Sequence, residues 1–302
     1  MKSSQPITPK HKKTIIDITI VGADRKGVIA DVTNFIFKAG GNIEQVNQNV
    51  VRGLFGMHLE ASFQKISRPE IDKGLEKLSK KLRMEIKVHY KEPNRLRNVA
   101  ILVSGEPECL MRILEAKMNG EISCNISVVI GTDDKLRPIA DNAQIPFETV
   151  IYRERSEEPE KKILELIECY DIDLIILARY MRILSPNFVW RYPNRIINIH
   201  PSLLPAFPGA YPYVQAYERG AKVMGCTAHF VTEDLDQGPI ICQESFKVSP
   251  SDTLESIKKK GRALEASTLL EALKLYLAGR LEVYWGRVHI LSKQSVPEVQ
   301  VK

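Results

Sequence analysis

The chain has 302 residues, of which 44% are hydrophobic and 26% are charged, and it carries a formal net charge of +6. This is the composition of an ordinary soluble globular protein with room for two domains. The 43 Lys and Arg residues are scattered among 37 Asp and Glu residues. A nucleic-acid partner is therefore not expected, whereas an anionic small molecule fits the modest basic excess.

Residues 1–13 form a polar tail without the apolar segment of a signal peptide, and no apolar run reaches the length of a membrane span. The five cysteines include no C-x-x-C pair, which predicts reduced thiols rather than a disulfide framework or a zinc site. We therefore expect a cytoplasmic protein with no membrane partner.

The first ninety residues predict a small α+β domain over 14–90. The order of its elements, βαββαβ, is the split ferredoxin-like pattern. Hydrophobic spacing and turn residues place these elements. In chain order we expect a strand at 14–22, a helix from Val28 to a stop at Gly40-Gly41, strands at 42–51 and 54–63 around a turn at Arg52-Gly53, a helix at 69–83 and a strand at 85–90.

Residues 91–97 (KEPNRLR) read as a linker, and the pattern changes after them. Continuous apolar runs over 98–302 predict strands that are buried on both faces, in a Rossmann-like, mostly parallel α/β domain. A capping box at Asp252 and Glu255 begins a long helix that ends before Gly279. The expected elements are strands at 98–104, 126–132, 173–179 and 195–200, helices at 110–118, 138–144, 161–170 and 252–278, an antiparallel pair at 223–232 and 239–248, and a hairpin-like strand at 283–291.

One strand carries polar side chains at its end. Asn198 and His200 lie at the close of an apolar run, and the strand period of two puts both on one face. Ligands of open α/β sheets bind beyond such strand ends. With Asp236 they make an amide, an imidazole and a carboxylate, a set suited to attack on a carbonyl carbon. Purely structural hydrogen bonds, a buried His229 and a simple D-x-G turn are the alternatives.

The same residues carry a resemblance. The segments NIHPSLLPAFPGAYPYVQAYERG and GCTAHFVTEDLDQGPII resemble the core signature of folate-dependent formyltransferases, with Asn198, His200 and Asp236 at the spacing of that family's catalytic triad. LARYMRILSP (177–186) resembles the family's folate-pocket loop. The segment ADRKGVIADVTNFI resembles an ACT domain, and an ACT domain ahead of a formyltransferase domain is the layout of the formyltetrahydrofolate deformylase family.

The resemblance implies hydrolysis of 10-formyltetrahydrofolate to formate and tetrahydrofolate, which balances one-carbon folate pools for purine synthesis. Asn198 and His200 would stabilise the oxyanion, and Asp236 would position water and move protons. No cofactor or metal is implied, since the folate is the substrate. Thr227 and His229 would support the triad side chains through contacts outside the substrate pocket. The Leu204–Pro205 peptide bond is implied to be cis. The implied substrate-binding residues are Met181, Arg182, Ile183, Leu184, Thr232, Glu233 and Asp234.

Two residues depart from the deformylase pattern, Pro201 after His200 and Glu108 before the Cys-Leu of the first α/β helix; deformylases typically have His at both positions. One alternative is therefore a formyltransferase acting on an amine such as glycinamide ribonucleotide, although Glu106 and Glu108 would repel its phosphate. Methionyl-tRNA formyltransferase would need a further C-terminal domain. The other alternative is a folate- or amino-acid-binding regulator with an inactive site.

ACT domains often pair side by side and bind an amino acid at their interface, so the resemblance implies a homo-oligomer, a dimer or a tetramer. Asp24, Arg25, Lys26 and Gly27, together with Asn42 on the next strand, would bind the effector. The alternative is that this domain serves assembly only.

Overall fold

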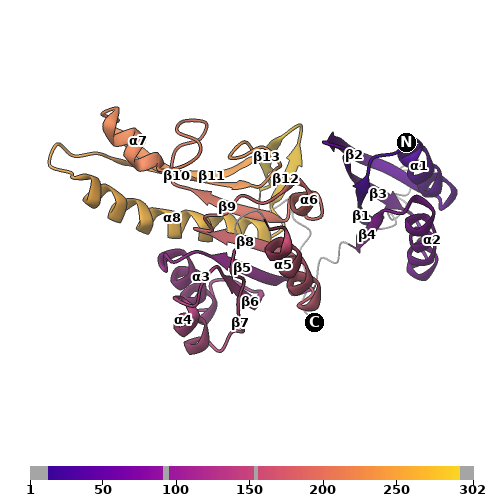
Figure 1. Cartoon of the computed structure of the whole chain (residues 1–302), viewed down its shortest axis with the longest axis horizontal. Coiled ribbons are helices and arrows are strands. Elements are labelled where there is room, and N and C mark those ends of the chain that lie inside the picture. Colours follow the sequence, from indigo (N-terminus) through magenta and orange to yellow (C-terminus); the bar gives the residue numbers. More distant parts are fainter. Residues whose placement is uncertain (1–12, 91–94, 153–155, 293–302) are drawn as a thin grey trace, which may run out of the picture. The chain divides into compact units, whose positions relative to one another are not determined.

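The computed structural model describes residues 13–90, 95–152 and 156–292, and the chain divides into one unit over 1–93 and a second over 94–302 (Figure 1). The polar tail up to residue 12 and most of the predicted linker (91–94) lie outside the described residues. No helix among the described residues is long and apolar enough to cross a membrane.

The first unit is a four-stranded antiparallel sheet with two helices, in the predicted βαββαβ order. Its strands lie in the order β2-β3-β1-β4. The turn between β2 and β3 has positive φ at both Arg52 (49°) and Gly53 (79°), as a two-residue hairpin of the primed type requires. The elements are β1 (Thr14–Ala23), α1 (Val28–Lys38), β2 (Gly41–Val51), β3 (Leu54–Phe63), α2 (Arg68–Leu82) and β4 (Glu85–Tyr90).

Helix α2 turns Ile71, Leu75, Leu78 and Leu82, which recur every three or four residues, to the core. Alternate residues of β1 point the same way: Ile16, Ile18 and Ile20 are fully buried in that core. Both helices pack against these residues and therefore cover one face of the sheet.

The second unit has a seven-stranded sheet in the order β11-β10-β9-β8-β5-β6-β7. Strands β5 to β9 are parallel, and β10 and β11 are antiparallel. The elements are β5 (Asn98–Val103), α3 (Glu108–Met118), β6 (Asn125–Gly131), α4 (Arg137–Asn142), β7 (Phe147–Thr149), α5 (Glu158–Cys169), β8 (Leu174–Ala178), α6 (Pro186–Val189), β9 (Ile196–His200), α7 (Pro212–Glu218), β10 (Val223–Phe230), β11 (Ile240–Lys247), α8 (Leu254–Leu277), β12 (Leu281–Tyr284) and β13 (Arg287–Ile290).

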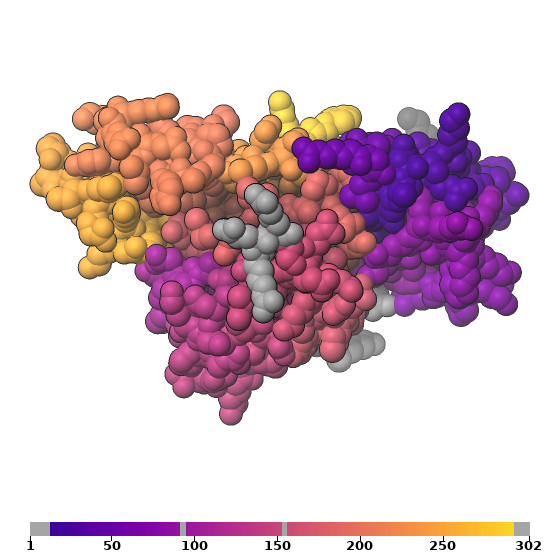
Figure 2. Space-filling view, viewed as in Figure 1, coloured from indigo at the N-terminus to yellow at the C-terminus, as the bar shows by residue number. Residues whose placement is uncertain are grey.

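Helices cover both faces of the parallel part of this sheet. Alternate residues of β5 show it: Val99, Ile101 and Val103 pack with α3, α4 and α8, whereas Ala100 and Leu102 pack with α5 and α6. This two-sided burial explains the continuous apolar runs. Figure 2 shows the side chains of α7 and of the start of α8 together at one end of the unit.

The strand order reverses beside β5. The chain runs from β5 to β6 and β7 in one direction, then returns to β8 and β9 on the other side of β5. In open α/β sheets this is the place where ligands bind, beyond the carboxyl ends of the strands. The loops after β5, β8 and β9 therefore meet at the expected site.

Two details differ from the sequence prediction. The cap of α8 is Thr253, whose hydroxyl accepts from the Ser256 amide over 3.2 Å, so the predicted capping box at Asp252 is wrong. Asp252 instead accepts from the Ser249 amide at 2.8 Å and pairs with Lys260. The short elements β7, α6 and α7 were not predicted, since three to seven residues carry too little periodicity.

Candidate active site

A pocket of about 510 Å³ lies at the carboxyl ends of β5, β8 and β9. Its walls come from the loop after β8, the end of β9, the start of α7, the loop between β10 and β11, and the start of α8. All three triad candidates line it: Asn198, His200 and Asp236.

Asn198 and His229 are direct neighbours across the antiparallel strands β9 and β10. The Nδ1 atom of His229 lies 2.9 Å from the Phe230 carbonyl, and its Nε2 lies 3.2 Å from the Asn198 amide nitrogen. A carbonyl can only accept, so Nδ1 carries the proton and Nε2 accepts from Asn198. This fixes which side of the Asn198 side chain is the donor.

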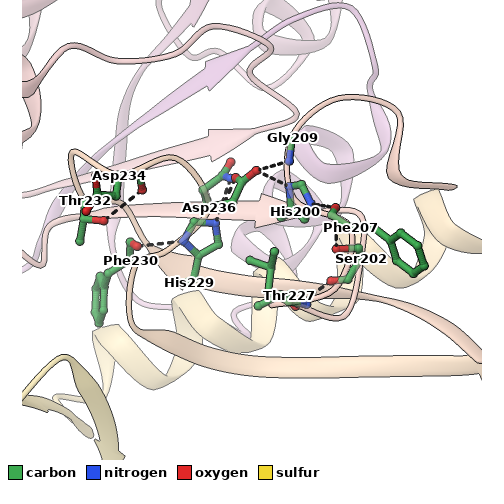
Figure 3. Close-up of polar contacts among 12 residues, drawn as sticks. His200, Ser202, Phe207, Gly209, Thr227, His229, Phe230, Thr232, Asp234 and Asp236 are labelled. Carbon is green, nitrogen blue, oxygen red and sulfur yellow. Dashed lines mark hydrogen bonds and ion pairs between the residues drawn. The ribbon is translucent and has the colours of Figure 1, made fainter. Parts of the chain in front are cut away.

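His200 and Asp236 form the second contact of the site, shown in Figure 3. The Nδ1 atom of His200 lies 3.3 Å from Asp236 Oδ2, and its Nε2 lies 3.0 Å from the Phe207 carbonyl. The Gly209 amide donates to the same Oδ2 over 2.8 Å. Both ring nitrogens of His200 thus face acceptor oxygens, and each of them can donate where it carries a hydrogen.

Two shifted pKa values follow from this geometry. Burial lowers the pKa of His229 and outweighs the attraction of Asp236, so the ring is neutral at neutral pH. Burial alone would raise the pKa of Asp236. The hydrogen bonds from His200 and from the Gly209 amide outweigh it and lower that pKa below its ordinary 3.8. The site therefore holds a charged carboxylate that contacts the His200 ring on one side and lies near the neutral His229 ring on the other.

The D-x-G sequence places Asp236 by close packing. Asp236 itself has a left-handed backbone, with φ 57°, which Asp tolerates better than most residues. A Cβ atom on Gly238 would lie 1.7 Å from the Phe230 carbonyl oxygen, so only glycine lets this segment press against the end of β10. The D-x-G segment is therefore a turn, and the same turn places the Asp236 side chain in the pocket.

Thr227 supports the opposite side of the site, where it faces His200 across β9 and β10. Its buried hydroxyl donates to the Ser202 carbonyl over 2.7 Å and accepts from the Leu204 amide at 3.0 Å. It thereby holds the loop after β9, in which the Leu204–Pro205 peptide is cis as the resemblance implied.

The residues implied to bind substrate all line the pocket. On one side, the Met181 amide donates to Ser104 Oγ over 3.3 Å, and the Arg182 guanidinium lies 5.0 Å from the centre of the Tyr152 ring. On the other side, the hydroxyl of Thr232 donates to the Asp234 carbonyl over 3.2 Å. The structure brings together the implied residues Met181, Arg182, Ile183, Leu184, Thr232, Glu233 and Asp234 with the triad.

Sequence reasoning missed a buried charge cluster beside the pocket. Glu265 is fully buried; its Oε2 lies 3.1 Å from Arg179 Nη1, and its Oε1 accepts from the Tyr213 hydroxyl over 2.9 Å. Burial raises the pKa of Glu265. A signal was available, because Glu265 falls on the same four-residue row of α8 as Ile257 and Gly261, both buried.

The predicted effector residues do not come together in one chain. Arg25 donates to the Leu82 carbonyl over 3.0 Å, and Asn42 donates to Glu44 Oε1 over 3.1 Å. The loop 24–27 follows the end of β1, whereas Asn42 lies across β3 from Ile15, at the start of β1. The eight residue-to-residue steps from Ile15 to Ala23 separate them by about 26 Å. The loop and Asn42 therefore lie at opposite ends of one sheet, and the effector site at an interface of two ACT domains stays a prediction.

Among the described residues, no group of three or more His, Cys, Asp or Glu side chains is arranged to hold a metal ion. The described cysteines carry no disulfide, and burial raises the pKa of Cys109, Cys226 and Cys242, which leaves them as thiols.

Comparison with known proteins agrees with this geometry. Residues 97–273 match the formyl transferase family and residues 14–89 match the ACT domain family. Formyltetrahydrofolate deformylases from Bacillus subtilis (40% identity, 89% of this chain and 91% of the relative) and Escherichia coli K12 (41%, 89% and 95%) are similar along nearly their whole length.

Solved structures of two kinds are similar to this chain. A formyltetrahydrofolate deformylase from Pseudomonas syringae has a TM-score of 0.65 at 30% identity and covers 94% of this chain and 96% of its own. A glycinamide ribonucleotide transformylase from Symbiobacterium toebii has a TM-score of 0.63 at 36% identity, but covers 68% of this chain and 97% of its own.

The sheet, its strand-end triad and the pocket thus define a formyl transferase fold. The ACT domain ahead of it and the full-length relatives narrow the assignment, and the chain belongs to the formyltetrahydrofolate deformylase family.

Proposed function

We propose that this protein hydrolyses 10-formyltetrahydrofolate to formate and tetrahydrofolate, with water as the formyl acceptor. The observation that carries the proposal is the oriented set of Asn198, His200 and Asp236 at one wall of the pocket. The formate released is a one-carbon unit that purine synthesis can use. The catalytic domain is the segment 98–302.

The site geometry supports direct attack. Water adds to the formyl carbon while Asp236 accepts its proton, and a C–O bond forms. The Asn198 amide and an N–H group of the His200 ring stabilise the negative oxygen that develops. For His200 this role requires that one of its two hydrogen bonds, to Phe207 or to Asp236, is exchanged when substrate binds. The bond from carbon to N10 then breaks, N10 takes the proton from the Asp236 carboxyl group, and the formic acid that leaves gives its proton to solvent to become formate.

Met181–Leu184 and Thr232–Asp234 would bind the pterin end of the folate, partly through backbone groups. This proposal is supported by their position on the two sides of the pocket that flank the triad. His229 would orient the Asn198 amide, and Thr227 would hold the loop that follows His200. The reaction as written uses no cofactor, and we propose a cytoplasmic location.

The direct test is to mix the purified protein with 10-formyltetrahydrofolate, with no amine present, and to follow formate and tetrahydrofolate. We expect catalytic release of both. Binding of the folate without release would contradict the proposal, and addition of glycinamide ribonucleotide to the same mixture would then show whether an amine is the acceptor.

For the ACT unit we propose regulation through a homo-oligomer, with a small amino acid at an interface of two ACT domains. Since loop 24–27 and Asn42 lie at opposite ends of one sheet, one effector site needs the loop of one chain and Asn42 of a second. Sedimentation gives the oligomeric state, and equilibrium dialysis with millimolar glycine or methionine tests binding. No binding would leave the assembly role alone.

A further inference from the structure

The pocket has one charged wall that the proposed chemistry does not use. It is built from Glu106 in the loop after β5, Glu108 at the first turn of α3, Arg179 after β8, and Arg262 and Glu265 on α8; this set is called the charged wall below. Glu106, Arg179 and Arg262 line the pocket directly.

Arg262 is held by carboxylates on several sides. Its Nε lies 3.1 Å from Glu108 Oε1, its Nη1 lies 3.8 Å from Glu106 Oε2, and its Nη2 lies 3.8 Å from Glu255 Oε1. From the sequence, Glu106 and Glu108 were expected to repel a phosphate. In the structure they also pair with the Arg262 guanidinium, a group that would otherwise be able to bind a phosphate.

Arg179 is likewise engaged. Its Nη1 pairs with the buried Glu265, which the Tyr213 hydroxyl also contacts. Both guanidinium groups of the wall thus have carboxylate partners already. Lys258, one turn before Arg262, also lines the pocket, and it offers a single ammonium rather than the planar fork that binds phosphate in two places.

The wall keeps two polar atoms that are buried and lack a hydrogen-bond partner among the described residues, Glu108 Oε2 and Arg179 Nε. One accepts and the other donates, so a small neutral molecule that can do both, such as water, suits each of them. An anion would satisfy the donor and be repelled by the acceptor.

We propose that the charged wall determines the acceptor: Glu106 and Glu108 keep Arg262 occupied, so amines that carry a phosphate find no unpaired guanidinium in this wall and the formyl group passes to water. This inference rests on the proposed hydrolysis. It makes Glu106 and Glu108 specificity-determining residues rather than catalytic ones.

The test uses the full chain and the variants Glu106→Gln and Glu106→Gln/Glu108→Gln, which keep side-chain size and release Arg262. Glu255→Gln is the matched control: Glu255 contacts the same guanidinium, but its side chain is 77% exposed, so solvent screens this contact and its loss should change little. Formate release from 10-formyltetrahydrofolate is measured with increasing glycinamide ribonucleotide, with neutral glycinamide and with inorganic phosphate, and each protein's rate without addition is its own reference.

We expect glycinamide ribonucleotide to inhibit the double variant, or to become formylated by it, at a concentration at least tenfold below any effect on wild type. The single variant should shift in the same direction, and Glu255→Gln should behave as wild type. Glycinamide without phosphate should not distinguish the proteins. Equal responses of wild type and double variant, including no response of either, would overturn the proposal. Absence of formate release from wild type in every mixture would instead refute the proposed hydrolysis.

Discussion

Asn198 donates its amide hydrogen to Nε2 of His229 across the β9–β10 pair, over 3.2 Å. His229 can accept there because its own proton is held by the Phe230 carbonyl. The neutral histidine thus orients the amide, and the second amide hydrogen of Asn198 is left to act in the pocket.

The first prediction concerns this orientation. His229→Leu removes the acceptor, so the Asn198 amide can turn its oxygen toward the substrate. We expect kcat to fall by roughly 10- to 100-fold with little change in KM, because an interaction made in the transition state is weakened. Asn198→Ala should lower kcat by at least the same factor. In the double variant the two losses should not add; full additivity would show that His229 acts independently of Asn198.

The second prediction concerns Asp236. Asp236→Asn keeps the size of the side chain but removes its basicity, and we expect turnover to fall by about 10²- to 10⁴-fold while the protein stays folded. Because hydrogen bonds hold its pKa below 3.8, the wild-type rate should lose its dependence on this group above about pH 5. Steady-state kinetics and circular dichroism measure both. A variant with the wild-type rate would remove Asp236 from the triad.

The third prediction is a pH dependence of stability. Burial lowers the pKa of His229 from 6.5, so the unfolded chain binds a proton more readily than the folded one. Stability from this group is present above about pH 6.5 and is lost as pH falls toward the folded pKa. Urea unfolding of wild type between pH 7 and pH 5 should show the loss, and His229→Leu should show less of it. Parallel curves would contradict a buried neutral His229.

The fourth prediction concerns Glu265. Glu265→Ala leaves Arg179 without its carboxylate and Tyr213 without its acceptor, and breaking a buried pair in this way costs about 3–5 kcal/mol. Tyr213→Phe removes only the hydroxyl and should cost about 1 kcal/mol. The free energy of unfolding in urea gives both values. Glu265→Gln keeps one donor and one acceptor, so its loss of unfolding free energy should lie between those of Tyr213→Phe and Glu265→Ala. A Glu265→Ala variant as stable as wild type would contradict a stabilising role for the buried Glu265–Arg179 pair.

Much of the scaffold was predictable because its patterns are local. The apolar run that ends in Asn198 and His200 specifies a buried strand, and the strand period alone puts both side chains on one face. The link to Asp236 came through the resemblance and the D-x-G turn. What could not be predicted is the path of the loop after β9, which brings the Phe207 carbonyl and the Gly209 amide to His200 and Asp236.

The buried pair of Arg179 and Glu265 could not be predicted for a different reason. Arg179 and Glu265 are 86 residues apart in sequence, and no local pattern joins them. The separation of Asn42 from the loop 24–27 within one chain, in contrast, follows from the order of the elements. A helix that returns the chain to the same edge makes β2 run parallel to β1, so the start of β2 must lie away from the loop that follows β1. The predicted βαββαβ order therefore already implied that Asn42 and the loop 24–27 lie apart within one chain.

The contacts of Asp236 make its two oxygens chemically different. Oδ2 accepts from both His200 and the Gly209 amide, whereas Oδ1 lies 4.0 Å from the His229 Nε2 atom, beyond hydrogen-bonding distance. Two contacts already engage the lone pairs of Oδ2, so the lone pairs of Oδ1 are the more basic ones. The carboxylate therefore presents a single basic atom, and Oδ1 is the atom that accepts the proton from water.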